Sequence, residues 1–276
     1  MVRGVSYGGT VFAVTDFTAN HNRNLITEQG MGLGGEPVIY DGATLITGSI
    51  GAVYRDSFAT YAQAVLDLLS GASSTISTNI LISSDETSGV SFPSSFINSF
   101  ELNLQSKDMA RCTMGFVATG PGSAGSVGTA ASYTDAVPIG WASTLSIDSV
   151  VIKTTGITLR LEVPIDQDNY VIGNKYLDEI IQSGNGTLSG SLTLAPSEWT
   201  ILQSAMGSCG NLSGDIVITL NGQSASDCST SLVRTITITD AVTSDSSFSG
   251  QNRNKFTKTL NWKAPVGTAT NHNLFS

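Results

Sequence analysis

The sequence is poor in charge, in aromatic residues and in histidine. Of its 276 residues, 13% are charged, 7% are aromatic and only two are His. In their place stand 37 Ser, 31 Thr and 29 Gly. A helical bundle is rich in Ala, Leu, Glu and Lys, so this composition disfavours one. The length suits one large domain or two small ones, and either can bury a core.

Positive charge is also scarce. Lys and Arg number 13 against 22 Asp and Glu, which leaves a net charge of −9. The field of such a chain repels phosphates and anionic lipids, so ordinary nucleic-acid binding is disfavoured. No stretch approaches the roughly 18 apolar residues of a membrane span, and the segment Met1–Tyr7 lacks the apolar core of a signal peptide. We therefore expect a soluble protein made in a cytoplasm, without a membrane partner.

Cysteine usage excludes a disulfide framework. The three residues Cys112, Cys209 and Cys228 are an odd number and form no Cys-x-x-Cys pair, as a tetrahedral zinc site would need. We expect isolated thiols in or beside a sheet. A bridge between Cys209 and Cys228, formed after release from the cell, is the alternative.

Signals for catalysis are weak. The two histidines, His21 and His272, lie in polar segments that we expect to face solvent, and no Gly-x-Ser-x-Gly elbow is present. Gly30–Gly35 satisfies Gly-x-Gly-x-x-Gly, but Pro37 and the strand-like Val38–Tyr40 follow where a dinucleotide site needs a helix. We expect neither an enzyme nor a bound cofactor.

The acidic segments and the tryptophans are explained without a binding site. Asp166–Asn169 begins like a calcium loop but lacks the bidentate Glu at its twelfth position, and Asp178–Glu179 is typical of a surface pair, so no metal site is predicted. A glycosidase built from distant carboxylates stays open, because such sites leave little local trace. Each tryptophan fits a core position: Trp141, Trp199 and Trp262.

Strict alternation of apolar and polar residues predicts antiparallel strands with one buried and one wet face. Asn221-Gly222 is typical of a tight turn at the end of such a strand. The predicted strands are Ile216–Leu220, Arg234–Asp240, Lys255–Trp262, Ser99–Gln105 and Arg111–Ala118, several of them paired in long hairpins.

Two segments have a helical period, one in each half of the chain. Ser57–Leu69 has Asp56 or Ser57 as its N-cap, and Ser197–Met206 follows Pro196. On the first helix the predicted apolar face consists of Phe58, Tyr61, Ala62, Val65, Leu66 and Leu69. On the second it consists of Trp199, Leu202 and Met206.

The chain also resembles itself. Gly48–Ile50, ahead of the first helix, matches Gly190–Leu192, ahead of the second, and Gly115–Ala118 matches Leu260–Ala264 at nearly the same offset. We predict a tandem duplication of an α+β unit, with a boundary in the Gly-rich and Ser-rich stretch Gly120–Ala131. The domains are then 1–125 and 138–276, joined by a linker or loop at 126–137. Chance similarity within one β domain is the alternative.

The order of these segments resembles bacteriophage tail tube proteins. The second half resembles them best, over roughly residues 138 to 265, and the first half repeats a looser version that has Thr47–Ile50 and the longer helix. The segments that support the resemblance are Pro138–Asp148, Gly156–Leu161, Tyr170–Lys175 and Gly186–Leu194.

The resemblance implies a mainly β fold with two tandem β-sandwich or barrel-like tail-tube domains, each flanked by one helix. It implies a structural virion protein whose subunits join sheets in a ring, as pseudo-hexameric trimers, and whose rings stack into the hollow tail tube that carries DNA into the host. The expected partners are further copies of the chain and other tail proteins: the tape measure, the terminator, the baseplate or tip, and a sheath where one exists. DNA passes only as non-specific cargo. We expect assembly in the host cytoplasm and a final place in the virion.

Two groups of residues follow as candidates within that resemblance. Carboxylates on or beside strands of the second half are candidates for the channel lining, since acidic side chains do not retain passing DNA; they are Glu162, Asp166, Asp168, Asp178 and Glu179. Long loops are candidates for ring stacking; their residues are Asp85, Glu86, Phe92, Ser226, Asp227 and Phe248.

Two other functions remain open. A β-rich adhesin or receptor-binding module shares this composition, although the missing signal peptide and the few aromatic residues argue against it. A distal or terminator ring of the same tail is the second.

Overall fold

The computed structural model describes residues 4–7, 10–12, 14–28, 38–69, 78–83, 89–125, 136–198, 214–223, 228–249, 257–266 and 273–274. The prediction of a mainly β fold is confirmed, since strands dominate these residues and their pairings are antiparallel. The helical elements are η1 (Asp56–Phe58), α1 (Ala59–Leu69) and η2 (Pro196–Glu198).

The strands of the first half, in chain order, are β1 (Gly4–Tyr7), β2 (Thr10–Phe12), β3 (Asp16–Arg23), β4 (Ile26–Glu28), β5 (Val38–Tyr40), β6 (Thr44–Val53), β7 (Thr78–Ser83), β8 (Gly89–Gln105), β9 (Arg111–Ala118) and β10 (Ser123–Ala124). Those of the second half are β11 (Val137–Pro138), β12 (Thr144–Ile147), β13 (Val150–Ile152), β14 (Thr154–Glu162), β15 (Thr187–Leu194), β16 (Ile216–Gln223), β17 (Thr230–Ile238), β18 (Val242–Ser249), β19 (Thr257–Ala264) and β20 (Asn273–Leu274).

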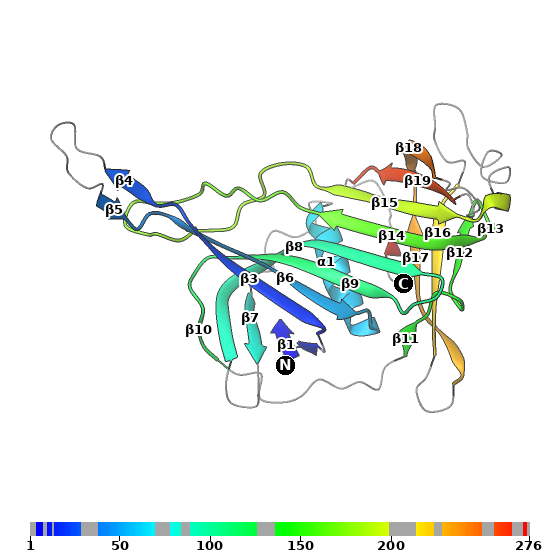
Figure 1. The fold of residues 1–276 in the computed structure, drawn as a ribbon, viewed down its shortest axis with the longest axis horizontal. Helices are drawn as coiled ribbons and strands as arrows, with labels where there is room; N and C mark the ends of the chain where they lie inside the picture. The colour runs from blue at the N-terminus through cyan, green and yellow to red at the C-terminus, as the bar shows by residue number, and fades with distance from the viewer. Residues whose placement is uncertain are drawn as a thin grey trace.

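A large antiparallel sheet runs the length of the molecule (Figure 1). Its central strands follow the order β3-β6-β9-β8-β14-β15-β19-β18. The first part of β8 leaves this plane and pairs with β7, which pairs with β1. A second sheet, built on β12, β16 and β17, stands across one end of the large one.

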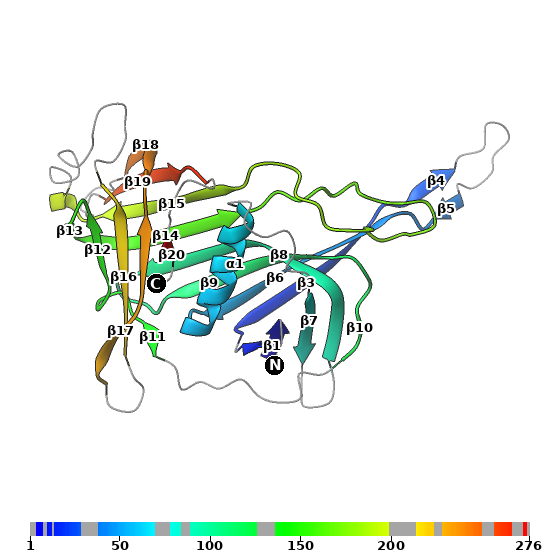
Figure 2. The same ribbon diagram turned by 180° about the vertical axis from the view of Figure 1, so that it is seen from behind.

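The helix α1 covers one face of the large sheet and leaves the other face uncovered, as the view from behind shows (Figure 2). All six residues of its predicted apolar face are buried, because that face packs on the sheet: Phe58, Tyr61, Ala62, Val65, Leu66 and Leu69. The first helix and its buried face are therefore confirmed. Of the second predicted helix, residues 199–206 lie outside the described part of the chain.

Two sets of four strands pair in the same order. We call β3, β6, β9 and β8 the first sheet unit, in which β6 lies between β3 and β9, and β9 pairs with β8. The second sheet unit consists of β14, β15, β19 and β18, paired in the same way. The flanking strands correspond as well, since β1 pairs with β2 and β7 while β12 pairs with β13 and β16.

A glycine under an aromatic ring occurs in both units. A Cβ on Gly48 would overlap the Phe116 ring and the Thr18 carbonyl oxygen, and a Cβ on Gly190 would overlap the Trp262 ring and the Thr158 carbonyl oxygen. Only glycine leaves room for the ring on the strand beside it.

Three local expectations were wrong. Asn221-Gly222 makes no turn, because β16 continues through both residues with a register shift after Leu220. Neither Asp56 nor Ser57 caps the helix: Arg55 holds the cap position of η1 without a side-chain cap, and Asp56 instead binds an arginine. Trp141 is 64% exposed, whereas Trp262 is buried as predicted.

Candidate assembly interface

The two sheet units meet edge to edge at what we call the seam, the pairing of β8 with β14. Seven consecutive residue pairs join these strands, from Gly156 opposite Gln105 to Glu162 opposite Ser99. The buried side of the seam carries Phe100, Leu102, Leu159 and Leu161, on which α1 packs. Buried apolar contact and backbone pairing together make the seam a continuous part of one sheet.

An ion pair ties the start of the helix to the second sheet. The Arg234 guanidinium of β17 binds both carboxylate oxygens of Asp56, with Nη2 to Oδ2 at 3.1 Å. The hydrogen bond to Asp56 raises the pKa of Arg234 above its ordinary value. This bidentate geometry fixes the start of the helix of the first unit against a strand of the second half.

The outer strands of the large sheet are its two edges. Within the described residues, β3 pairs only with β6 and β18 pairs only with β19. When the two units are compared strand by strand, β3 has the position of β14. In the same way, β18 has the position of the part of β8 that forms the seam. Each edge therefore has the same place in its unit as one side of the seam, but has no neighbour within the described chain.

The uncovered face of the large sheet is polar. Alternate residues of its strands point there, and most are Ser, Thr or Asn. Examples are Asn20, Ser49 and Asn103, of which Ser49 Oγ lies 2.8 Å from Thr18 Oγ1. The charged residues of this face whose side chains the structure describes are three of each sign: Asp16, Glu101 and Glu162, and Arg111, Arg160 and Lys263.

Along one line of paired residues on this face, the acidic residues belong to the first sheet unit and the basic residues to the second. Asp16, Glu101, Arg160 and Lys263 lie on a line of residue pairs that crosses seven strands from β3 to β19. Arg160 also bonds Glu162, with Nη2 to Oε2 at 3.0 Å. A face whose described acidic and basic side chains are equal in number, and which carries many hydroxyls, holds water without a large net charge.

The carboxylates predicted for the channel lie in two places. Glu162 is on the polar face, at the end of β14, and is neutralised by Arg160. The other four lie in the long segment between β14 and β15, where Asp166 Oδ1 accepts a hydrogen bond from the Asp168 backbone and Asp178 and Glu179 are exposed. The structure thus brings one of the five to the sheet face, and Glu101, which the sequence did not single out, stands beside it.

The residues predicted for ring stacking also separate. Phe92 is 4% exposed and packs on Phe17 and Phe116, so it belongs to the core of the chain and not to a loop surface. Phe248 lies within β18. The other four, Asp85, Glu86, Ser226 and Asp227, fall outside the described residues.

The described residues show no cluster that could hold a metal ion. His21 is exposed, as expected, although it lies on β3 and not in a loop. Cys112 is buried in β9 and Cys228 is exposed, while Cys209 and His272 lie outside the described part. Burial raises the pKa of the Cys112 thiol far above its ordinary value.

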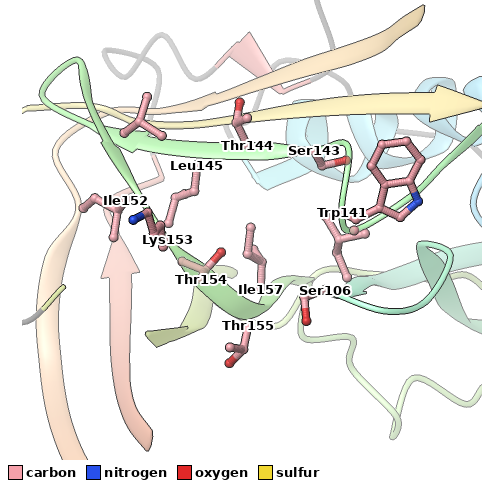
Figure 3. Close-up of a pocket in the computed structure, with 14 residues that line it drawn as sticks. Ser106, Trp141, Ser143, Thr144, Leu145, Ile152, Lys153, Thr154, Thr155 and Ile157 are labelled. Atoms are coloured by element: carbon pink, nitrogen blue, oxygen red, sulfur yellow. The ribbon is translucent and has the colours of Figure 1, made fainter. Parts of the chain in front are cut away.

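Exposed apolar residues lie at both ends of the long axis, on which β4 and β5 stand opposite β12 and β13 (Figure 1). At one end the separate two-stranded hairpin of β4 and β5, which we call the arm, exposes four large apolar residues: Leu25, Ile26, Ile39 and Tyr40, by 48 to 60%. At the other end lies a pocket of about 300 Å³ lined by apolar and polar side chains, among them Trp141, Lys153 and Thr154 (Figure 3). Neither the arm nor the pocket was predicted from the sequence, although Val38–Tyr40, one strand of the arm, was described as strand-like. The further signal available for the arm was the apolar pair Leu25 and Ile26.

These features define a class of protein: a β-rich subunit with two complementary sheet edges that have no neighbour within the described chain, one polar sheet face and exposed apolar residues at both ends, suited to associate with copies of itself. The chain belongs to the phage tail tube protein family, whose model matches residues 66–264. The resemblance drawn from the sequence is thereby confirmed, and with it a structural role in the tail of the virion, in assembly with itself and other tail components. A search of curated proteins finds no match. No helix among the described residues is long and apolar enough to cross a membrane.

Proposed function

We propose that three copies of this chain close into a ring through their sheet edges, that each chain contributes two tube-type domains, and that such rings stack into the tube through which DNA leaves the virion. The observation that supports the ring is the seam, in which one unit is already joined to an equivalent unit. Repeating that contact between chains would pair β18 of one chain with β3 of the next. A head-to-tail contact of this kind closes when the rotation per unit divides a full turn, and closure leaves no edge open.

The seam also gives a register for the contact between chains. Asn20 of the first unit corresponds to Arg160 of the second, because Asn20 lies opposite Thr47 and Arg160 lies opposite Ser189. Ser247 of the second unit corresponds to Glu101 of the first, because Ser247 lies opposite Thr259 and Glu101 lies opposite Thr113. Since Arg160 and Glu101 face each other across the seam, the same pairing between chains would place Asn20 opposite Ser247.

The uncovered polar face is the side of this ring that suits a channel. The other face carries α1 and the core, so only the polar face can line a hole without further cover. Its balanced charges and hydroxyls offer passing DNA few uncompensated cations, and each phosphate contact with a cation would add affinity and slow transit. In this proposal Glu101 and Glu162 prevent Arg160 from binding phosphate.

Disulfide trapping tests the ring and its register. In a chain carrying Cys112→Ala, Cys209→Ser and Cys228→Ser, the pair Asn20→Cys and Ser247→Cys should yield covalent trimers on oxidation, seen on non-reducing gels. The control pair Asn20→Cys and Thr235→Cys, which combines β3 with a strand of the second sheet, should yield none. Rings of normal size without any trapped trimer would contradict the register, and monomers at all concentrations would contradict the ring.

The channel lining is tested by charge. Glu101→Gln with Glu162→Gln should leave ring and tube assembly intact but give a tube that retains DNA, with slower genome ejection measured by dye release from filled particles. The matched control is Asp178→Asn with Glu179→Gln, in the segment beyond the sheet, which should eject normally. Equal slowing by both pairs would argue against the polar face as the lining.

A further inference from the structure

We propose that the pocket is a binding site for an acidic sugar, a hexuronate unit of a polysaccharide, and that through it the tail adheres to acidic polysaccharides. The sugar site lies within one chain, so it is tested on the free subunit and does not depend on the proposed ring. Only the adhesion of the tail rests on the proposed function.

The pocket lies where the second sheet crosses the end of the seam. Its lining includes buried apolar residues of β8, β14, β12 and β13: Leu104, Ile157, Leu145 and Ile152. Leu104 and Ile157 pair across the seam, and Leu104 shares the buried side of β8 with Leu102. The pocket is therefore on the other side of the large sheet from the polar face, and a bound sugar would not stand in the proposed channel.

Lys153 gives the pocket a positive charge. Of the described residues that line the pocket it alone is charged, and it makes no ion pair with the described part of the chain. The nearby Glu198 is 4% exposed and does not line the pocket: its Oε2 accepts from the Lys153 backbone amide at 3.3 Å and its Oε1 from the Ser197 hydroxyl at 3.0 Å. An exposed ammonium among uncharged side chains is a partner for one carboxylate of a ligand.

Three hydroxyl groups of the lining are free to bond a ligand. Those of Ser106, Thr144 and Thr154 have no hydrogen-bond partner among the described residues. The other two, those of Ser143 and Thr155, donate to backbone carbonyls at 2.9 and 3.3 Å. Each sugar hydroxyl both donates and accepts, so a sugar can pair with the free groups.

A β-bulge lies beside the pocket. Thr154 is opposite Leu194 and Gly156 is opposite Thr193, so Thr155 is an extra residue in β14. A bulge changes the direction of the side chains next to it and occurs often beside functional sites. Here it gives the lining two consecutive threonines, of which Thr154 keeps its hydroxyl free.

Trp141 supplies an aromatic face on a fixed turn. It is 64% exposed, and Figure 3 shows it toward the opposite side of the pocket from Lys153. The turn is held by Asn221 Nδ2, which donates to the Ala142 carbonyl at 2.8 Å, and by the Ala142 amide, which donates to the Ile139 carbonyl at 3.1 Å. The apolar C–H face of a sugar ring can pack on such an indole, and a fixed indole loses little entropy on binding.

These groups together match an acidic sugar better than other small anions. One ammonium balances one carboxylate, whereas phosphate sites are built from several donors, such as a helix N-terminus or arginine side chains. A fatty acid would leave the three hydroxyls without partners. The volume of about 300 Å³ is at the lower end for ligand pockets, so the pocket suits one sugar ring at a time.

Adhesion follows from repetition of the site. A single small site holds one sugar weakly, but in the proposed tube every subunit carries the pocket. A polysaccharide with repeated hexuronate units can occupy several pockets at once, and linking weak sites raises the overall affinity by about 10²–10⁴. The tail would then stay close to an acidic polysaccharide without a separate adhesive domain.

Titration of the free subunit tests the class of ligand. Galacturonic acid, followed by saturation-transfer NMR, should bind saturably with a Kd in the millimolar range, and galactose should bind at least about tenfold more weakly because it lacks the carboxylate. Inorganic phosphate should not displace the acid. No saturable binding would overturn the site, equal affinity for the two sugars would overturn the role of Lys153, and displacement by phosphate would show a general anion site and overturn the sugar.

Variants of the free subunit test the residues. Trp141→Ala should weaken binding of galacturonic acid by at least about tenfold, through loss of the stacked indole. Lys153→Met keeps the apolar stem of the side chain and should lower the affinity for galacturonic acid to that for galactose. The matched control Lys263→Met removes an exposed lysine of the polar face and should leave both affinities unchanged. Equal weakening by the two lysine variants would show a general effect of charge and overturn the site.

Assembled tubes test the adhesion. Tubes should bind polygalacturonate at least about a hundredfold more tightly than the free subunit does, measured by co-sedimentation, and should not bind dextran. Tubes of Lys153→Met should lose this gain. Tubes that ignore polygalacturonate while the free subunit binds galacturonic acid would overturn the adhesion and uphold the sugar site. An unaltered chain that forms no rings would reject the proposed function, whereas the sugar site would stand on the titration of the subunit.

Discussion

The first and second sheet units share one pairing order but differ in what is attached to them. Each has a small residue under a ring, Gly48 under Phe116 and Gly190 under Trp262. The first unit alone carries the arm, and the seam joins its β8 to β14 of the second. The comparison shows that the sheet is held constant by packing, while loops and ends, which carry few buried contacts, are free to acquire separate roles.

The largest expected effect follows from removing the aromatic side chain that covers each glycine. Trp262→Ala and Phe116→Ala should each lower the free energy of unfolding by about 3–5 kcal/mol, because a buried aromatic side chain is replaced by a cavity. Denaturant unfolding of the isolated subunit measures this. Trp141→Ala is the control and should change the free energy by less than about 0.5 kcal/mol, since its side chain is mostly exposed. A similar loss in the control would contradict the assignment of Trp141 to the surface.

Adding a methyl group beneath each aromatic side chain should cause the next largest loss of stability. Gly48→Ala and Gly190→Ala should each cost about 1–3 kcal/mol of stability through overpacking against ring and backbone. The control Gly184→Ala should be tolerated, because a Cβ there meets only Pro164 at 3.7 Å. If the two units are equivalent, the two substitutions have similar costs; a cost in one unit only would break the comparison.

The ion pair between the halves should contribute less. Arg234→Ala should lower stability by about 1 kcal/mol, because the pair is bidentate but partly exposed to water. A double-mutant cycle with Asp56→Ala measures the coupling free energy. The control cycle on Arg160 and Glu162, both about half exposed, should show a smaller coupling free energy in the isolated subunit. Equal coupling in the two cycles would argue against a special role for Asp56 at the helix start.

The smallest effect concerns reactivity alone. Burial raises the pKa of the Cys112 thiol, so in single-cysteine chains Cys228 should react with iodoacetamide in the folded state and Cys112 only after unfolding. Mass spectrometry over time measures the two rates. Fast labelling of Cys112 under native conditions would show that β9 opens locally, which would set the first unit apart from the second.

The local sequence pattern predicted elements correctly where burial alone decides the structure. Alternation along Ser99–Gln105 and Arg111–Ala118 predicted two strands that the structure pairs as β8 and β9. The helical period of Ser57–Leu69 predicted a face whose residues are all buried, and missed only Ala59 among the described buried residues of α1. It failed at Asn221-Gly222 because pairing with β11 and β17 extends the strand past a dipeptide that otherwise favours a turn. It failed at Trp141 because a turn beside β8 displays the indole to solvent.

The candidate interface was predicted only in outline. Sequence pattern indicated open-edged strands and a repeated unit, and it named Glu162, which does lie on the polar face. It missed the balancing Arg160 and Glu101, the arm and the pocket, because each depends on residues from strands that are distant in the chain. The four carboxylates of 163–186 were placed near strands by sequence proximity, yet the segment leaves the sheet at Val163.

By itself the sequence determined which residues face inward, because the period of apolar residues reports burial on one side of a strand or helix. Only the tertiary structure decided which strands are neighbours: that β8 pairs with β14, that Arg234 meets Asp56, and that arm and pocket stand at opposite ends. The physical reason is that backbone pairing is the same for every residue type, so the choice of partner strand depends on how the whole core packs.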